Sequence, residues 1–300
     1  MSKDPIVSII IVSYNTCEMT LEAIRSAQEQ TKAVCEFIVV DNASEDGSAD
    51  AIGKTFPHIK LLAEKVNHGF AKANNIAAKH ATGEFLLLLN PDTVTLDGAI
   101  DKLIAFAERR PEAKIWGGRT LYGDMSLNTT NCWNHMTVWS LFCSAFGLSK
   151  LFHGSSFFNP EGYGNWDRST ERDVGFVTGC FLMIRREFWN ALEGFDLSFK
   201  MYGEEADLAL RAQQKGAKPR VTPDATIIHF VGASSKQEAS KLILVLKAKS
   251  TLIRRYFNPY ERTIGISLLY LQALVRVPFS RSWRKAWSAR SDWIPGYSVE

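Results

Sequence analysis

The first part of the chain alternates between short apolar runs and longer stretches with helical spacing. Four apolar runs, rich in β-branched residues or leucine, are present at residues 6–13, 36–41, 59–64 and 84–90. Each is followed by a stretch whose apolar residues recur with a helical period, at residues 16–30, 48–56, 69–83 and 96–110. Continuous apolar runs are typical of strands buried on both faces. The alternation predicts an α/β fold: a doubly wound, Rossmann-like, mainly parallel sheet with right-handed crossovers, in which Gly83 ends the third helix.

The pattern changes after this region. Residues 120–170 are rich in aromatic residues, Gly, Asn and Ser, and their weak periodicity predicts loops and short helices. The apolar run at 174–184 predicts a further strand, and 204–216 predicts a helix. A short strand is predicted at 227–230.

In the last 60 residues the apolar positions recur with helical spacing, and the net charge differs from that of the rest of the chain. The segment 263–277 is amphipathic, but it is too short and too often interrupted to span a bilayer. We therefore predict one domain with a basic amphipathic helical extension. The expected boundaries are a domain over 1–235, with halves at 1–118 and 119–235, and an extension over 236–300.

The charge of the chain is unevenly distributed. Residues 241–300 contain eleven Lys and Arg against three Asp and Glu, whereas the net charge of the whole chain is +3. An acidic body with a basic tail favours an anionic partner near the tail, such as membrane lipid or a phosphorylated acceptor; charge alone leaves nucleic acid open. In the segment 281–287, Trp283 and Trp287 alternate with basic residues, a combination that favours the lipid headgroup region. The alternative is a tail that packs on its own domain or on a second subunit of a homodimer.

Composition narrows the class of protein. Hydrophobic residues make up 46% and charged residues 22% of the chain, as in ordinary globular proteins. The five cysteines are odd in number and form no CxxC pair, which argues against a disulfide framework or a structural zinc site. The apolar run at the N-terminus is too short for a signal peptide core. We expect a cytoplasmic protein, with peripheral attachment to the inner face of the plasma membrane if the tail binds lipid.

Polar residues follow three of the predicted strands at their carboxyl ends. They are Ser13-Tyr14-Asn15, Asp41-Asn42 and Asn90-Pro91-Asp92. Open α/β sheets bind ligands beyond the carboxyl ends of their strands, so these groups are expected to converge on one crevice. Asn-Pro-Asp is also ordinary turn chemistry, so a plain turn is the alternative at the third position.

These segments resemble a known family. "VSIIIVSYN", "FIVVDNASEDGS", "NHGFAKANN" and "GEFLLLLNPDT" resemble the nucleotide-sugar half of glycosyltransferase family 2, and "VTGCFLMIRREFWNALEGFDLSFKMYGEEADLALRAQQKG" resembles its acceptor and catalytic half. The similarity covers about 6–232 and is strongest to bacterial rhamnosyltransferase-like members that build surface polysaccharide. The family implies a GT-A fold, an inverting mechanism and usually a divalent metal ion, Mg²⁺ or Mn²⁺.

The resemblance implies a donor site for a UDP- or dTDP-sugar. It assigns Asp41 to the N3–H of a pyrimidine base, whereas the alternative is a loop aspartate that caps the turn with Asn42 and Ser44. The residues expected to bind the nucleotide sugar are Ser13, Tyr14, Asn15, Asp41, Asn42, Gly69, Asn75 and Asn90.

The resemblance also implies a metal site. Asp92 matches the last aspartate of the family's Asp-x-Asp signature, whose first acidic position is Asn90 here. One carboxylate together with diphosphate oxygens suits Mg²⁺ or Mn²⁺, which take few protein ligands. His229 matches a histidine that acts in the family as a second ligand or a diphosphate contact; a structural histidine is the alternative.

The catalytic base is expected in "GEEAD", residues 203–207. The family places the base at the second position of an acidic pair, usually an aspartate, which corresponds to Glu205 here. Glu204, Gly179 and Trp166 are expected to line the acceptor site, and Asp207 is expected to pair with Arg211, four residues on. The alternative is a solvated helix start, where acidic residues favour the helix dipole.

Together these features predict an inverting glycosyltransferase. It would move a sugar, with rhamnose as a candidate, to a hydroxyl of a saccharide or lipid-linked acceptor in surface polysaccharide synthesis, and no nucleic acid partner is expected. The rival prediction is a non-catalytic nucleotide-sugar-binding protein of the same fold, because Asn90 and Glu205 depart from the usual pattern.

Overall fold

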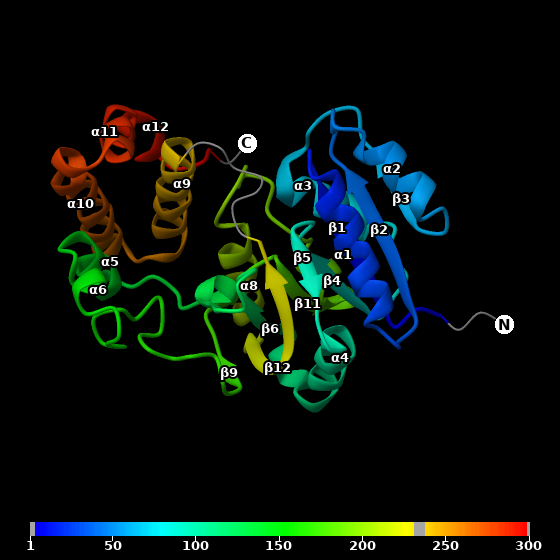
Figure 1. Cartoon of the computed structure of the whole chain (residues 1–300). Coiled ribbons are helices and arrows are strands. Elements are labelled where there is room, and N and C mark those ends of the chain that lie inside the picture. Colours follow the sequence, from blue (N-terminus) through cyan, green and yellow to red (C-terminus); the bar gives the residue numbers. More distant parts are fainter. Residues whose placement is uncertain (1–3, 231–237, 299–300) are drawn as a thin grey trace.

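A computed structural model of the chain describes residues 4–230 and 238–298. Within them, a ten-stranded mixed sheet occupies the centre (Figure 1). The strand order is β3-β2-β1-β4-β11-β6-β12-β5, with the short β7 (Leu127–Asn128) beside β6 and β9 (Arg172–Asp173) beside β12. A separate two-stranded sheet pairs β8 (Cys132–Trp133) with β10 (Phe176–Val177).

The N-terminal half has the predicted parallel, doubly wound arrangement. Its strands are β1 (Val7–Ser13), β2 (Cys35–Asp41), β3 (Lys60–Ala63) and β4 (Phe85–Leu89). Its helices are α1 (Cys17–Glu29), α2 (Ser48–Thr55), α3 (Gly69–Ala78) and α4 (Ala99–Arg109). The alternation of apolar runs and helical stretches therefore identified these strands and helices, and it missed the short β5 (Thr93–Thr95) and a 3-10 turn at Pro111–Ala113.

The predicted end of the third helix was wrong. α3 ends at Ala78, and Gly83 lies in the turn that enters β4. The backbone N–H of Gly83 donates to Ser8 Oγ at 2.9 Å, and a Cβ at this position would lie 2.7 Å from the Ser8 nitrogen. Gly83 is therefore required for the close approach of this turn to β1 and does not end the helix.

The second half of the sheet is built from β6 (Ile115–Leu121), β11 (Phe181–Arg185) and β12 (Arg220–His229). β6 was not predicted, because Gly117, Gly118 and Arg119 interrupt its apolar run. A Cβ on Gly118 would lie 2.2 Å from the carbonyl oxygen of Ala225, so tight packing on β12 excludes a side chain there. The strand predicted at 227–230 is the end of the ten-residue β12, and the strand predicted at 174–184 is divided into β10 and β11.

Strand directions decide which segments meet. β1, β2, β3, β4, β6 and β12 run in one direction, whereas β11 and β5 run in the other. The carboxyl ends of the first group therefore share one edge of the sheet with the amino ends of β11 and β5. The segments that lie at this carboxyl edge are 13–15, 41–42, 90–92, 178–180 and 229.

Both faces of the sheet are covered, as the apolar strands predict. On one face Ile9 and Ile11 pack in a core shared with Ile24 of α1 and Leu103 of α4. On the other face Ile10 packs in a core shared with residues of α3 and with α8 (Glu204–Gln214), and the short α7 (Arg186–Ala191) adjoins β11. This rigid double-sided packing fixes the strand ends that carry the polar residues.

The C-terminal helices form a group of their own on one side of the molecule (Figure 1). It comprises α9 (Glu238–Tyr256), α10 (Pro259–Arg276), α11 (Arg281–Ser288) and α12 (Arg290–Trp293), and it packs against α5 (Val138–Ala145), which precedes α6 (Leu148–Leu151). The predicted helical extension is thus confirmed. The domain boundary expected between 235 and 236 lies outside the described residues. In the described ranges we find no helix with the length and apolarity that a bilayer crossing requires.

Candidate active site at the carboxyl edge of the sheet

A carboxylate and an imidazole meet at the carboxyl edge. Asp92 directly precedes β5 and His229 ends β12, and the antiparallel register pairs His229 with Thr93. His229 Nε2 lies 3.2 Å from Asp92 Oδ1 and 3.3 Å from Asn90 Nδ2. The structure therefore brings together three residues that are separated by up to 139 positions in the sequence.

Opposing effects act on the pKa of His229. Burial disfavours its charged form, but the contacts with Asp92 and Cys180 outweigh that effect and raise the pKa of His229 to about 10. Its Nδ1 atom is buried and has no hydrogen-bond partner among the described residues. The imidazole is thus held by the carboxylate and is not satisfied as a purely structural side chain would be.

The Asp92–His229 pair has the chemistry of a small divalent-metal site. Two ligands at right angles around Mg²⁺, each at about 2.0–2.1 Å, lie about 3 Å apart, close to the separation of Asp92 Oδ1 and His229 Nε2. No cluster of three or more His, Cys, Asp or Glu side chains suited to a metal occurs in residues 4–230 and 238–298. A two-ligand site suits Mg²⁺ or Mn²⁺, which usually keep waters and accept phosphate oxygens.

Asp41 divides its two carboxylate oxygens between two roles. Oδ2 accepts the backbone N–H of Ser44 at 3.1 Å, as the turn-capping alternative expects. Oδ1 is buried and has no partner within the described part of the chain. A buried carboxylate oxygen without a donor is costly unless a ligand supplies one, so Oδ1 is available to accept a hydrogen bond from a ligand.

The other residues predicted to bind the nucleotide sugar position the loops around this edge. Asn42 Oδ1 accepts the N–H of His68, and its Nδ2 donates to Asn67 Oδ1, which ties β2 to the loop before Gly69. Asn15 Oδ1 accepts the N–H of Glu45. The remaining members differ in surroundings: Ser13 bonds to Thr16 and Thr20, Tyr14 is exposed, and both amide atoms of Asn75 bond to the backbone of Phe195.

The segment Gly179–Cys180 connects Asn90 to the acidic helix. Its backbone N–H donates to Glu205 Oε1 at 3.1 Å, and the next carbonyl, of Cys180, accepts the N–H of Asn90 at 3.2 Å. A Cβ on Gly179 would lie 2.6 Å from Cζ of Phe70, in α3. Gly179 is therefore needed for close approach, and through it Glu205 is held at the same edge as Asp92.

The acidic pair lies at the first turn of α8, after Gly203 in a left-handed conformation (φ +90°). Glu204 is buried, and its Oε2 has no partner in the described residues, whereas Glu205 is partly exposed. Burial raises the pKa of Glu204 well above its usual value, and repulsion from Glu205 adds to the shift. Burial also raises the pKa of Glu205, against the opposing effect of the Gly179 hydrogen bond. Both carboxyl groups therefore favour the neutral form more than a solvated glutamate does, and Glu205 is the one that is partly exposed.

Asp207 is fully buried, and its carboxylate is bonded to side chains of α8 and α9. Arg211 Nε donates to its Oδ2 at 2.7 Å, which confirms the expected pair. Tyr256 OH donates to Oδ1 at 2.6 Å, and Arg255 lies 3.4 Å from the same oxygen. Sequence reasoning missed both α9 residues, because no spacing pattern links them to α8. With Glu204 and Asp207 buried, the helix start is not the solvated one of the alternative prediction.

Asp207→Asn is expected to lower the free energy of unfolding by about 1–3 kcal/mol, since it leaves buried donors without a charged acceptor. Tyr256→Phe removes one hydrogen bond and is expected to cost about 1 kcal/mol. Urea unfolding measures both. Asp173→Asn is the matched control: Asp173 also pairs with an arginine, Arg220, but it is exposed and is expected to contribute little. Equal effects of Asp207→Asn and Asp173→Asn would contradict the assignment of a buried network.

Trp166 lies elsewhere. Its ring packs on Tyr163 and faces the guanidinium groups of Arg168 and Arg172. Arg172 pairs with Val221 near the amino end of β12, about 25 Å along the strand from His229 at ~3.3 Å per residue. The structure therefore does not bring Trp166 together with the Asp92–His229 pair.

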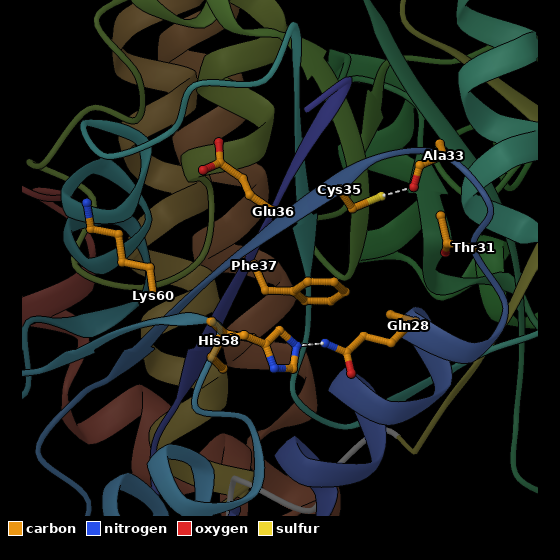
Figure 2. Close-up of a pocket in the computed structure, with 10 residues that line it drawn as sticks. Gln28, Thr31, Ala33, Cys35, Glu36, Phe37, His58 and Lys60 are labelled. Carbon is orange, nitrogen blue, oxygen red and sulfur yellow. Dashed lines mark hydrogen bonds between the residues drawn. The ribbon is translucent and has the colours of Figure 1, made fainter. Parts of the chain in front are cut away.

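A separate hollow of about 390 Å³ lies at the opposite edge of the sheet. Figure 2 shows its lining, which includes Cys35 and Glu36 at the start of β2 and Lys60 at the start of β3. Gln28 and His58 are hydrogen-bonded to each other there, at 2.7 Å. Since these residues are at the amino ends of the strands, the hollow is separate from the site at the carboxyl edge.

Comparison with known sequences agrees with this geometry. The family model for glycosyl transferase family 2 matches residues 8–192. The O-antigen biosynthesis protein RfbC of Myxococcus xanthus is 28% identical over 239 residues, which are 78% of this chain but 18% of that protein. An N-acetylglucosaminyl-diphospho-decaprenol L-rhamnosyltransferase of Mycobacterium tuberculosis is 24% identical over 274 residues, which cover 83% of each chain.

Solved structures show the same fold. The mannosyltransferase PcManGT of Pyrobaculum calidifontis, in complex with GDP-Man and Mn²⁺, has a TM-score of 0.57 at 17% identity and covers 99% of this chain and 77% of its own. GalNAc-T7 with UDP, GalNAc and Mn²⁺ has a TM-score of 0.66 at 16% identity and covers 91% of this chain and 52% of its own. These likenesses confirm the predicted GT-A fold.

Proposed function

The chain belongs to glycosyltransferase family 2, and from that premise we propose that it transfers a sugar from a UDP- or dTDP-sugar to an acceptor hydroxyl with inversion. The observation that carries the proposal is the hydrogen bond from Gly179 to Glu205, because it holds a partly exposed carboxylate at the edge where Asp92 and His229 meet. A base and a leaving-group site at one edge are what direct displacement at a sugar carbon requires.

We assign the donor to the N-terminal half, residues 1–118. The unpartnered Oδ1 of Asp41 would accept the N3–H of uracil or thymine, which favours a pyrimidine nucleotide. Asp92 and His229 would hold Mg²⁺ or Mn²⁺. When bound, the cation would offset negative charge on the departing diphosphate.

We assign the chemical step to the half formed by residues 119–235. Glu205 removes the proton of the acceptor hydroxyl, and the oxygen attacks the anomeric carbon on the face opposite the diphosphate. Glu204, whose burial favours the neutral form, would donate a hydrogen bond to the acceptor. Gly179 would line the acceptor site through its backbone, since Phe70 fills the space where a Cβ would lie.

The names of two relatives support one class of acceptor, a lipid-linked saccharide. The M. tuberculosis relative is named for an L-rhamnosyl donor group and a diphospho-decaprenol-linked acceptor, and the M. xanthus relative is named for O-antigen biosynthesis. We propose that this chain likewise adds a sugar, with rhamnose as the first candidate, to a lipid-linked saccharide of a surface polysaccharide.

A panel of UDP- and dTDP-sugars tests this function. We expect one donor to be hydrolysed slowly with Mn²⁺ or Mg²⁺, to release its nucleoside diphosphate, and to stop reacting when EDTA is added. Release is measured by chromatography of the nucleotides, and Glu205→Gln serves as the control for chemistry at this site. Tight donor binding without turnover across the panel and with candidate acceptors would favour the non-catalytic alternative.

A further inference from the structure

A continuous aromatic cluster covers the segment that contains α5 and α6. Six rings contact one another in sequence, with centroid separations from 4.6 to 6.3 Å. They belong to Trp139, Phe142, Phe146, Phe152, Phe157 and Phe158. Neighbouring rings stabilise each other, so the cluster is a preformed surface.

Much of this cluster is open to solvent. Phe146 is 55% exposed, Phe157 is 63% exposed, and Leu151 between them is 71% exposed. Just beyond α10, Phe279 is 84% exposed. Single exposed apolar residues are normal, but a contiguous group of large ones marks an interaction surface.

The end of α10 lies beside this cluster. Gln272 Nε2 donates to Ser144 Oγ at 2.9 Å, and Arg276 donates to the carbonyl oxygen of Ser144 at 2.7 Å. Figure 1 shows α5, α6 and α10 on the same side of the molecule. We call the surface formed by residues 139–158 and 272–285 the aromatic face.

The charge around the aromatic face is mainly positive. Residues 125–160 contain no Asp or Glu and one cation, Lys150. Residues 262–291 contain no Asp or Glu and six Lys or Arg. Arg281, Arg284 and Lys285 are exposed. Two segments that are distant in the sequence thus meet in a region that combines large apolar groups with an excess of cations; Glu161, which accepts a hydrogen bond from Ser140 of α5, is paired with Lys249.

Trp283 and Trp287, which the sequence suggested as lipid contacts, are occupied within the protein. Both are partly buried against the core of the C-terminal helices. Arg276 lies over the ring of Trp283, and Arg290 lies over the ring of Trp287. The exposed apolar side chains of the aromatic face that remain free to enter a lipid phase are therefore the phenylalanines and Leu151.

We propose that the aromatic face docks the protein on an anionic lipid bilayer. Exposed aromatic groups enter the interfacial region of a bilayer, and cations beside them are attracted to acidic headgroups. A protein partner with an acidic rim would satisfy the charge but not the need for a broad, flat apolar phase. The purpose of docking rests on the proposed function, since a lipid-linked acceptor lies at such a surface; the binding itself does not.

Vesicle sedimentation tests the proposal. We expect the protein to sediment with vesicles of phosphatidylcholine and phosphatidylglycerol in equal amounts, and to bind phosphatidylcholine alone much more weakly. Lys285→Glu is expected to weaken binding at least about fivefold, since each cation at an anionic surface contributes roughly that factor. The double variant Phe146→Ser and Phe157→Ser is expected to weaken it more.

Matched controls lie on the far side of the molecule. Lys54→Glu reverses an exposed cation on α2, and Val34→Ser removes an exposed apolar group before β2; neither is expected to change vesicle binding. Equal losses in the control and face variants would overturn the proposal, as would wild-type protein that fails to sediment with anionic vesicles. A chain that dimerises through these phenylalanines and ignores vesicles would also overturn it. Hydrolysis of the soluble donor by the same samples reports the proposed function separately, so either can fail alone.

Discussion

Asp92→Ala is expected to remove metal-dependent binding of the nucleotide sugar without unfolding the protein. In the proposed metal site, Asp92 would supply the carboxylate and His229 the second protein ligand. Even outer-shell partners of metal sites typically contribute 10–100-fold to affinity or activity, so the loss of a direct carboxylate ligand is expected to reach or exceed about 100-fold. Calorimetric titration of the nucleotide sugar with and without Mn²⁺ measures the effect.

Asp224→Ala is the matched control for Asp92→Ala. Asp224 is an exposed aspartate on β12, the strand that carries His229, so its removal changes the net charge equally and leaves the pair intact. Thermal unfolding of both variants checks that the fold persists. If Asp92→Ala binds the donor with unchanged affinity and unchanged metal dependence, Asp92 is not part of the site.

The sequence predicted the parallel half of the fold well because that half is simple. Runs such as Leu86–Leu89 are buried on both faces, so hydrophobicity alone marks them as strands. The same argument placed Asp41, Asn90 and Asp92 at strand ends, and the observed directions bring those ends to one edge. Here local pattern and tertiary structure agree.

The second half was harder because its strands depend on tertiary packing. β6 contains Gly117 and Gly118, which leave space for β11 and β12, and no local pattern indicates a strand there. β12 is irregular between Val221 and Thr226, so only its apolar end was visible in the sequence. Such elements are specified by their neighbours more than by their own residues.

In the candidate site, too, the sequence indicates some residues, whereas their roles depend on tertiary contacts. Glu205 and Asp207 could be singled out because they lie in one short acidic segment. Their roles depend on contacts from distant positions, namely Gly179 on the β10–β11 loop and Tyr256 on α9. A sequence lists these residues but does not show which carboxylate is buried and which is partly exposed.

Glu205→Gln is expected to bind the donor normally and to lose at least two decades of transfer rate. The substitution keeps the size of the side chain and its hydrogen bond from Gly179, but it removes the basicity. A hydroxyl is a poor nucleophile until its proton has an acceptor, and a positioned general base typically contributes about 10²–10⁴-fold. Single-turnover kinetics, with donor affinity measured separately, distinguish a lost chemical step from lost binding.

Glu204→Gln is the matched control, since it makes the same change one residue earlier. Glu204 is buried whereas Glu205 is partly exposed, so the amide at position 204 is expected to have the smaller effect on transfer. Burial also raises the pKa of Glu205, and a base works only when ionised. The wild-type rate should therefore fall as the pH drops through a midpoint above the usual glutamate pKa of about 4.3.

A Glu205→Gln variant that transfers sugar at nearly the wild-type rate, beside an inactive Glu204→Gln, would move the base to Glu204. Activity in both variants would remove the acidic pair from the chemical step.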